Sequence, residues 1–328
     1  MARKLRLEYP GAIYHVINRG NYRGDVFAGE KTKAAFESCL FEACARAQWV
    51  LHAFVVMRNH FHLALETPEA NLAAGMQWLL ATFAARFNRF RGERGHLFQG
   101  RYKALVVDAG TALGAVCDYI HLNPVRAGIV TPQSLDSYRY SSYWYLNRPK
   151  LRPPLLRVQT ALEQAGDLAD RPAGWAAYAA YLGWQAADGP AGKNAAYVNL
   201  SRGWALGSEA FKAELIQDHP LAAEARALES DGAQEVRQAR WQLALQRVLR
   251  KLPASARKAA DASQQNAGWK VAVAAHLKAT TDASNPWLAE QLQMGSGKYV
   301  SKLVGQLRQG SPVGAAWLRV LEKGKGTT

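Results

Sequence analysis

The chain has 328 residues, which is enough for two or three domains with sizeable cores. Lys and Arg total 41 against 26 Asp and Glu, and the resulting formal net charge of +15 indicates a polyanionic partner. Nucleic acid is the expected partner, with an anionic membrane surface or a merely basic protein as alternatives. The sequence has no apolar run of about 18 residues and no apolar signal segment, and its 3 cysteines lack the spacing of a disulfide framework or zinc site. We expect a cytoplasmic protein that does not bind membranes.

The first part of the chain alternates between strand-like and helix-like patterns. Apolar residues at every second position predict strands, and apolar residues three or four apart predict helices. The order β-α-β-β-α-β-α that results predicts an α+β fold: a ferredoxin-like antiparallel sheet with helices on one face. In chain order we expect a strand over 12–19, a helix over 31–48, a hairpin over 49–66, a helix over 71–91, a strand over 96–108, and a helix over 111–122 that ends at Asn123-Pro124.

The remainder of the chain has a different composition. Residues 147–157 (NRPKLRPPLLR) are basic and proline-rich, which predicts a linker at a domain boundary after residue 146. Beyond the linker, Ala, Gln, Arg and Trp recur at helical spacing, so we expect an all-α C-terminal region. We divide it into a helical region of unknown role (158–252), a compact helical unit (254–310) and a tail (311–328).

The 254–310 unit carries a nucleic-acid signal of its own. Helical patterns over 269–280 and 285–292 are followed by a break at Gly295 and a basic amphipathic helix over 298–308. This order is typical of a helix-turn-helix, in which the last helix enters a groove of duplex DNA. A plain helical bundle is the alternative. The candidate DNA contacts on the last helix are Lys298, Lys302 and Arg308.

Residues 59–63 (NHFHL) place two imidazoles close together. Side chains alternate between the two faces of a strand, so His60 and His62 project to the same side. Two histidines side by side on a sheet can hold a divalent metal ion. A pair of hydrogen-bonded surface histidines without a metal is the alternative.

A second candidate cluster lies on the predicted helix over 111–122. Tyr119 and Asn123 are four residues apart and share a helix face. A phenol beside a cation and a phosphate can ionise more readily, and an amide oxygen is a ligand that Mg²⁺ and Mn²⁺ accept. The alternatives are an ordinary half-buried tyrosine and a helix-capping asparagine before Pro124.

Basic and aromatic side chains alternate over residues 86–103. This composition is typical of a surface that follows a nucleic-acid backbone and stacks on its bases. A solvated basic face is the alternative. The candidate contacts are Arg86, Arg89, Arg91, Arg94, Arg101, Tyr102 and Lys103.

Four sequence motifs together resemble a known family. They are 14–20 (YHVINRG), 57–63 (MRNHFHL), 98–103 (FQGRYK) and 119–128 (YIHLNPVRAG). In this order and spacing they resemble the REP-associated tyrosine transposases, relatives of the single-tyrosine HUH transposases of bacterial insertion sequences. The resemblance covers residues 1–146 and implies an HUH nuclease domain.

The resemblance also implies the roles of individual residues. His60 and His62 would be the HUH histidines that bind Mg²⁺ or Mn²⁺, Asn123 the third ligand and Tyr119 the nucleophile. The implied reaction is cleavage and strand transfer of single-stranded, hairpin-forming DNA through a 5′-phosphotyrosine. Arg19 and Arg126, which lie in two of the motifs, would contact this DNA. His121 is expected to be structural or a DNA contact.

Two other functions remain open. The first is a DNA-binding regulator on an HUH scaffold without strand transfer, and the second is a metal-dependent hydrolase that uses water while Tyr119 is structural. We expect the protein to be associated with the nucleoid. The DNA sequence and the existence of a homodimer are left undecided by the sequence, as is whether the protein mobilises an element.

Overall fold

The computed structural model describes residues 7–187, 200–218, 230–253, 256 and 264–322. The chain forms two compact units. The first consists of Met1–Lys212 with Ala227–Gly232, and the second of Ala213–Arg226 with Ala233–Thr328. We describe each unit by itself.

The described residues of the first unit form a five-stranded sheet in the order β2-β3-β1-β4-β5. Strand β1 is antiparallel to both β3 and β4, and β3 is antiparallel to β2, which is the strand order of a ferredoxin-like fold. The predicted fold class is thereby confirmed. The strands are β1 (Ala12–Arg19), β2 (Val50–Val56), β3 (His60–Thr67), β4 (Lys103–Val107) and β5 (Ala205–Leu206).

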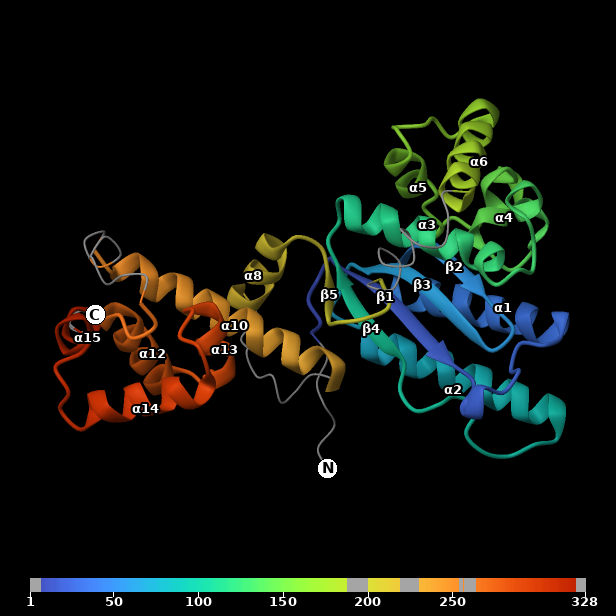
Figure 1. Ribbon diagram of the computed structural model, residues 1–328. Helices are drawn as coiled ribbons and strands as arrows, with labels where there is room; N and C mark the ends of the chain where they lie inside the picture. The colour runs from blue at the N-terminus through green and yellow to red at the C-terminus, as the bar shows by residue number, and fades with distance from the viewer. Residues whose placement is uncertain (1–6, 188–199, 219–229, 254–255, 257–263, 323–328) are drawn as a thin grey trace. The chain divides into compact units, whose positions relative to one another are not determined.

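Helices cover both faces of this sheet (Figure 1). Helices α1 (Glu30–Ala47) and α2 (Leu72–Arg91) cover one face and α3 (Thr111–Arg126) covers the other, so the prediction that the helices share one face was wrong for α3. Side chains along β3 point alternately to the two faces of the sheet, so neighbouring residues contact helices on opposite faces. Phe61 packs against Phe36 of α1 with ring centroids 4.6 Å apart, so the neighbouring histidines face α3.

Helix α3 is longer than we predicted. It continues through Pro124 to Arg126 instead of ending at residue 122. Proline removes one helical hydrogen bond, but the residues from Val116 to Pro124 are buried, and their packing outweighs that loss. The chain leaves the helix at Gly128, whose φ of +68° is one that glycine adopts without strain.

The predicted linker at 147–157 is not a linker in the structure. The Leu51 N–H donates to the Leu155 carbonyl at 2.9 Å, and the Arg157 N–H donates to the Leu51 carbonyl at 2.8 Å. The segment therefore runs along β2 and forms hydrogen bonds with the backbone at the edge of that strand, while Leu156 is buried. The basic, proline-rich composition did not reveal this packing. The short helices before and within the segment are η2 (Pro132–Ser137), α4 (Ser142–Leu146) and η3 (Pro149–Leu151).

The first unit also continues beyond the predicted boundary at residue 146. Helices α5 (Gln159–Gln164) and α6 (Pro172–Ala187) pack against α3. The region is not wholly helical either, because β5 adds to the edge of the sheet parallel to β4. The Asp108 N–H donates to the Leu206 carbonyl at 2.8 Å. A strand of two residues has no periodicity from which it could have been predicted.

The second unit contains the three helices predicted for residues 269–308. Trp241 on the preceding helix donates to Asp282 at 2.7 Å and packs on Trp287, so no boundary near residue 252 separates that helix from the others. Residues 254–255 and 257–263 of the predicted compact unit lie outside the described residues. The helices are α10 (Ser230–Lys251), α12 (Gly268–Thr280), α13 (Asn285–Gln291) and α14 (Gly297–Arg308), and α8 (Glu209–Asp218) lies across the division between the units.

Part of the predicted tail, 311–328, is helical, and residues 323–328 lie outside the described residues. Helix α15 (Ala315–Glu322) packs on α12, and its Leu321 is fully buried. An amphipathic helix that buries a leucine belongs to the core of the second unit. No helix in the described ranges is both long enough and apolar enough to span a bilayer.

Candidate active site

His60 and His62 lie together on the face of the sheet that α3 covers. Their ring centroids are 5.2 Å apart and their planes are nearly perpendicular. His62 is buried, whereas His60, at the start of β3, is half-buried. The strand register places Arg19 opposite His60 and Ile17 opposite His62. The predicted histidine pair is therefore formed by β3 at the end where β1 finishes.

Tyr119 of α3 lies against this pair. Its ring centroid is 5.3 Å from that of His62, with an interplanar angle of 81°. Only 8% of Tyr119 is exposed, and the Arg126 guanidinium lies 4.9 Å from the centre of its ring. A cation at this distance attracts the electron-rich face of the ring.

Asn123 lies one turn after Tyr119 and is buried. Its amide nitrogen donates to the Tyr119 carbonyl at 2.9 Å. This hydrogen bond identifies which end of the amide is nitrogen. The oxygen, which is the predicted ligand atom, is therefore directed away from the Tyr119 carbonyl.

Both histidines are held in the neutral form. Burial and then the charge of Arg19 lower the pKa of His60 to about 4. Burial, followed by the charges of the neighbouring histidines and of Arg19 and Arg126, places the pKa of His62 well below its ordinary value. Neutral imidazole is the form that binds metal ions, so both rings are ready to act as ligands at neutral pH.

The donor set fits a metal ion that takes few protein ligands. Within the described ranges, no three or more His, Cys, Asp or Glu side chains are arranged to hold a metal ion. A cation at His60 and His62 would therefore need neutral oxygen ligands as well, which Asn123, water or a phosphate can supply. Mg²⁺ and Mn²⁺ commonly retain water and bind substrate phosphates.

A third histidine, which the sequence analysis did not single out, touches the pair. His15 of β1 is fully buried, and its Nε2 lies 3.0 Å from His62 Nδ1. Its Nδ1 lies 2.7 Å from the Leu200 carbonyl oxygen. Burial lowers the pKa of His15 to about 4. The sequence feature that could have identified His15 as a site residue is its place in an otherwise apolar strand, inside the motif over 14–20.

Three of the predicted DNA contacts surround the histidines. Arg19 and Arg126 are exposed, and their charges lower the pKa of His62. Lys103 of β4 is half-buried, and its charge contributes to the low pKa of His15. These three cations, which we call the site cations, give the site a positive potential toward a phosphate backbone.

The predicted arginines of α2 are not part of this cluster. Helix α2 lies on the opposite face of the sheet (Figure 1), and Arg86 forms a two-bond ion pair with Glu42 at 2.8 and 2.9 Å. Arg91 pairs with Glu93 at 3.0 Å. Arg89 and Arg94 are exposed. The sequence pattern grouped these residues with the site because it does not show on which face a helix packs.

The loop after α2 does reach the site end of the sheet. The Gln99 N–H donates to the Arg19 carbonyl at 2.8 Å, and Arg101 is exposed. Tyr102 is 4% exposed, so it is not an open stacking platform as we had expected. Tyr22, which we had not predicted, is 93% exposed and follows the end of β1. It is a better candidate for stacking on a base.

His121 is structural. It is buried, with Nδ1 2.8 Å from the Tyr178 hydroxyl and Nε2 2.8 Å from the Ser142 hydroxyl. The Tyr178 and Tyr181 hydroxyls in turn donate to Asp118 at 2.8 and 3.0 Å. This buried polar network ties α3 to α6, and burial raises the pKa of Asp118 to about 6.

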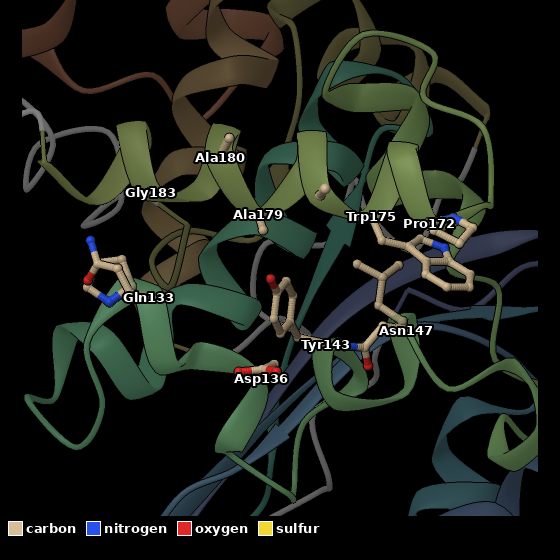
Figure 2. A pocket seen from close by; sticks show the side chains of 12 residues that line it. Gln133, Asp136, Tyr143, Asn147, Pro172, Trp175, Ala179, Ala180 and Gly183 are labelled. Atoms are coloured by element: carbon tan, nitrogen blue, oxygen red, sulfur yellow. The ribbon is translucent and has the colours of Figure 1, made fainter.

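A separate pocket of about 720 Å³ lies in the first unit (Figure 2). It is lined by residues of η2, α4 and α6, among them Gln133, Tyr143 and Trp175. None of the predicted site residues lines it, so the candidate chemistry lies elsewhere.

The predicted DNA contacts of the second unit lie on α14. Lys298, Lys302 and Arg308 are exposed, while Val300, Val304 and Leu307 of the same helix are buried. The helix therefore presents its cations to solvent, as the sequence pattern predicted.

The fold and the site together define a ferredoxin-like domain with a His-x-His pair facing a helical tyrosine. Residues 9–123 match the family described as "Transposase IS200 like". The predicted resemblance to transposases is thus confirmed for this part of the chain.

One similar solved structure is titled "Structure of the REP associates tyrosine transposase bound to a REP hairpin". It has 17% identity and a TM-score of 0.38, and the match covers 47% of this chain and 89% of the other. No curated protein sequence matches the chain.

Proposed function

We propose that the protein is a metal-dependent single-stranded DNA endonuclease and strand transferase that acts through Tyr119. The observation that carries the proposal is the position of the Tyr119 ring, 5.3 Å from that of His62, inside a segment that matches a transposase family. A nucleophile beside a pair of metal-binding imidazoles is an arrangement that can support metal-assisted phosphodiester transesterification.

Each residue of the site has a role in this proposal. His60 and His62 would hold Mg²⁺ or Mn²⁺, with the Asn123 amide oxygen as a third ligand. Bound there, the cation would polarise the scissile phosphate and neutralise its charge. The Tyr119 oxygen attacks phosphorus and loses its proton to solvent. The bond to the 3′ oxygen breaks, that oxygen takes up a proton, and a 5′-phosphotyrosine remains. Arg126, whose guanidinium lies over the Tyr119 ring, offers a charge to the phosphate.

The proposed substrate is single-stranded DNA that flanks a hairpin. The site cations support this substrate, because they surround the histidines at the end of the sheet. Tyr22 supplies an exposed ring for a base at the same end. A protein that acts on this DNA would work in the cytoplasm, with the nucleoid.

The organisation of the chain follows from the packing. We propose that the first unit is the catalytic one, since α5, α6 and β5 complete it. The second unit would bind duplex DNA through α14, as a helix-turn-helix.

A covalent adduct tests the proposal against the two alternatives. Labelled single-stranded oligonucleotides with hairpins from beside the gene would be incubated with protein and Mg²⁺ or Mn²⁺ and resolved on a denaturing gel. The expected product is a protein–DNA adduct. Cleavage without an adduct would indicate the water-dependent hydrolase, and binding without cleavage would indicate the regulator.

A further inference from the structure

We propose that His15 is a positioning residue that fixes the tautomer of His62, while Asn59 does the same for His60, so that both imidazoles present an unprotonated Nε2 to the metal ion. The inference rests on the proposed function, because it concerns how the same site is prepared for its metal. It assigns roles to His15, Asn59 and the Leu200 carbonyl that the motif does not specify.

One hydrogen-bond partner of His15 is a backbone carbonyl oxygen, which can only accept a hydrogen bond. The Leu200 carbonyl oxygen lies 2.7 Å from His15 Nδ1, so this nitrogen must carry the proton. His15 is fully buried, and burial disfavours a charged imidazolium, so the ring carries a single proton. Its Nε2 is therefore a lone pair that can only accept.

The same logic continues to His62. His62 Nδ1 lies 3.0 Å from His15 Nε2, and two ring nitrogens at this distance need one proton between them. That proton belongs to His62 Nδ1, since the proton of His15 is already on its Nδ1. Neutral His62 then has no proton on Nε2, and this atom is free to bind a metal ion.

His60 reaches the same state through a different partner. The Asn59 amide nitrogen donates to the Arg23 carbonyl at 3.2 Å, which assigns the amide oxygen to the other end. That oxygen lies 2.7 Å from His60 Nδ1, so Nδ1 carries the proton and Nε2 is unprotonated. Two backbone carbonyls therefore determine the tautomers of both rings.

A fixed tautomer matters most for His62 because it is buried. A neutral imidazole in the other tautomer would turn an N–H toward the cation and could not bind it. Partners of this kind typically change metal affinity about 10–100-fold when they are removed. Leu200 lies outside the segment that matches the transposase family, 9–123, so a later part of the first unit completes the hydrogen bonds.

The tautomers can be read directly in the metal-free full chain. Long-range ¹H–¹⁵N correlation spectra of protein labelled at its histidines distinguish a protonated from an unprotonated ring nitrogen. The expected result is Nδ1–H with an unprotonated Nε2 for His15, His60 and His62. A proton on His62 Nε2 in the wild-type protein would overturn the proposal.

Two variants of equal polarity separate a positioning role from simple packing. His15→Gln places an amide oxygen near the position of Nε2 and can still accept from His62. His15→Asn can still donate to Leu200 but is too short to reach His62. We expect the Gln variant to keep the His62 tautomer and the Mn²⁺ affinity, measured by electron paramagnetic resonance, and the Asn variant to show a mixed tautomer and about 10-fold weaker Mn²⁺ binding.

Equal Mn²⁺ affinity and equal tautomers in both variants would overturn the inference. Circular dichroism confirms folding, and if the Asn variant does not fold, the wild-type spectrum and the Gln variant decide. Failure of the proposed function is visible separately, as the absence of a DNA adduct with the wild-type protein. The tautomer measurement needs neither DNA nor cleavage.

Discussion

The Tyr119 ring on α3 stands nearly perpendicular to the His62 ring on β3, with centroids 5.3 Å apart. The two residues come from opposite layers of the first unit, a helix and the sheet it covers. The contact brings the proposed nucleophile to the two imidazoles proposed to bind the metal ion, and most of our predictions test this contact.

Tyr119→Phe should abolish adduct formation and leave DNA binding nearly unchanged. The substitution removes the oxygen that we propose attacks phosphorus but keeps the buried ring and its contact with Arg126. Denaturing gels measure the adduct and mobility shifts measure binding. Tyr22→Phe, at an exposed tyrosine, is the matched control and should cleave normally. An adduct in the Tyr119 variant would mean that another tyrosine is the nucleophile.

His60→Ala and His62→Ala should each lower the cleavage rate on the order of 100-fold or more, and EDTA should have the same effect. One imidazole cannot keep a labile cation in place, so the double variant should lose little beyond either single one. His96→Ala, at an exposed histidine, is the control. Full activity in EDTA would exclude a metal from the reaction.

Arg126→Gln should slow cleavage about 10-fold, whereas Arg86→Gln should not. The Arg126 guanidinium lies over the Tyr119 ring, while Arg86 is paired with Glu42 on the other face of the sheet. Single-turnover rates at saturating DNA measure the difference and separate it from binding. Equal losses of rate in the two variants would indicate that the arginines of α2 contact the DNA after all.

Replacing Lys298 and Lys302 together by Gln should weaken binding to duplex DNA and reduce its salt dependence. Each DNA phosphate that the protein no longer neutralises lowers the log–log slope by about 0.9. Cleavage of short single-stranded oligonucleotides should be unchanged. Arg319→Gln on α15 removes an exposed charge from the same unit and is the control. An unchanged slope would mean that α14 does not touch phosphates.

The free energy of unfolding should fall as the pH drops from about 6.5 toward 4. Burial lowers the pKa of His121 to about 3 and that of His52 to about 4. Between these values and the ordinary histidine pKa, the unfolded chain therefore binds protons that the folded chain does not bind. Asp118 acts in the opposite direction, because its pKa is raised to about 6 and the folded state gains a proton below that pH. Because two histidines oppose the single carboxyl of Asp118, the net effect of lowering the pH is a loss of stability.

Urea unfolding at several pH values measures this dependence. We expect a loss of more than about 1.4 kcal/mol per pH unit between pH 6 and 5, which corresponds to more than one proton. A free energy of unfolding that does not change with pH would show that these histidines can be protonated in the folded state.

The sequence by itself determined the elements whose residues repeat with a clear period. The alternation along 12–19 and 60–66 predicted β1 and β3 and placed His60 and His62 on one face. Apolar spacing likewise predicted α12, α13 and α14 nearly to the residue, with exposed lysines on α14. These features depend on local geometry, which neighbouring residues specify.

Only the tertiary structure decided which segments meet. The pairing of Leu51 with Leu155, the short strand β5 and the contact of His15 with Leu200 all join parts of the chain that are distant in sequence. No local period encodes them, because they form when an edge strand and a buried imidazole need hydrogen-bond partners. For the same reason the face on which α2 packs, and with it the separation of Arg86 from the site, followed from packing and not from composition.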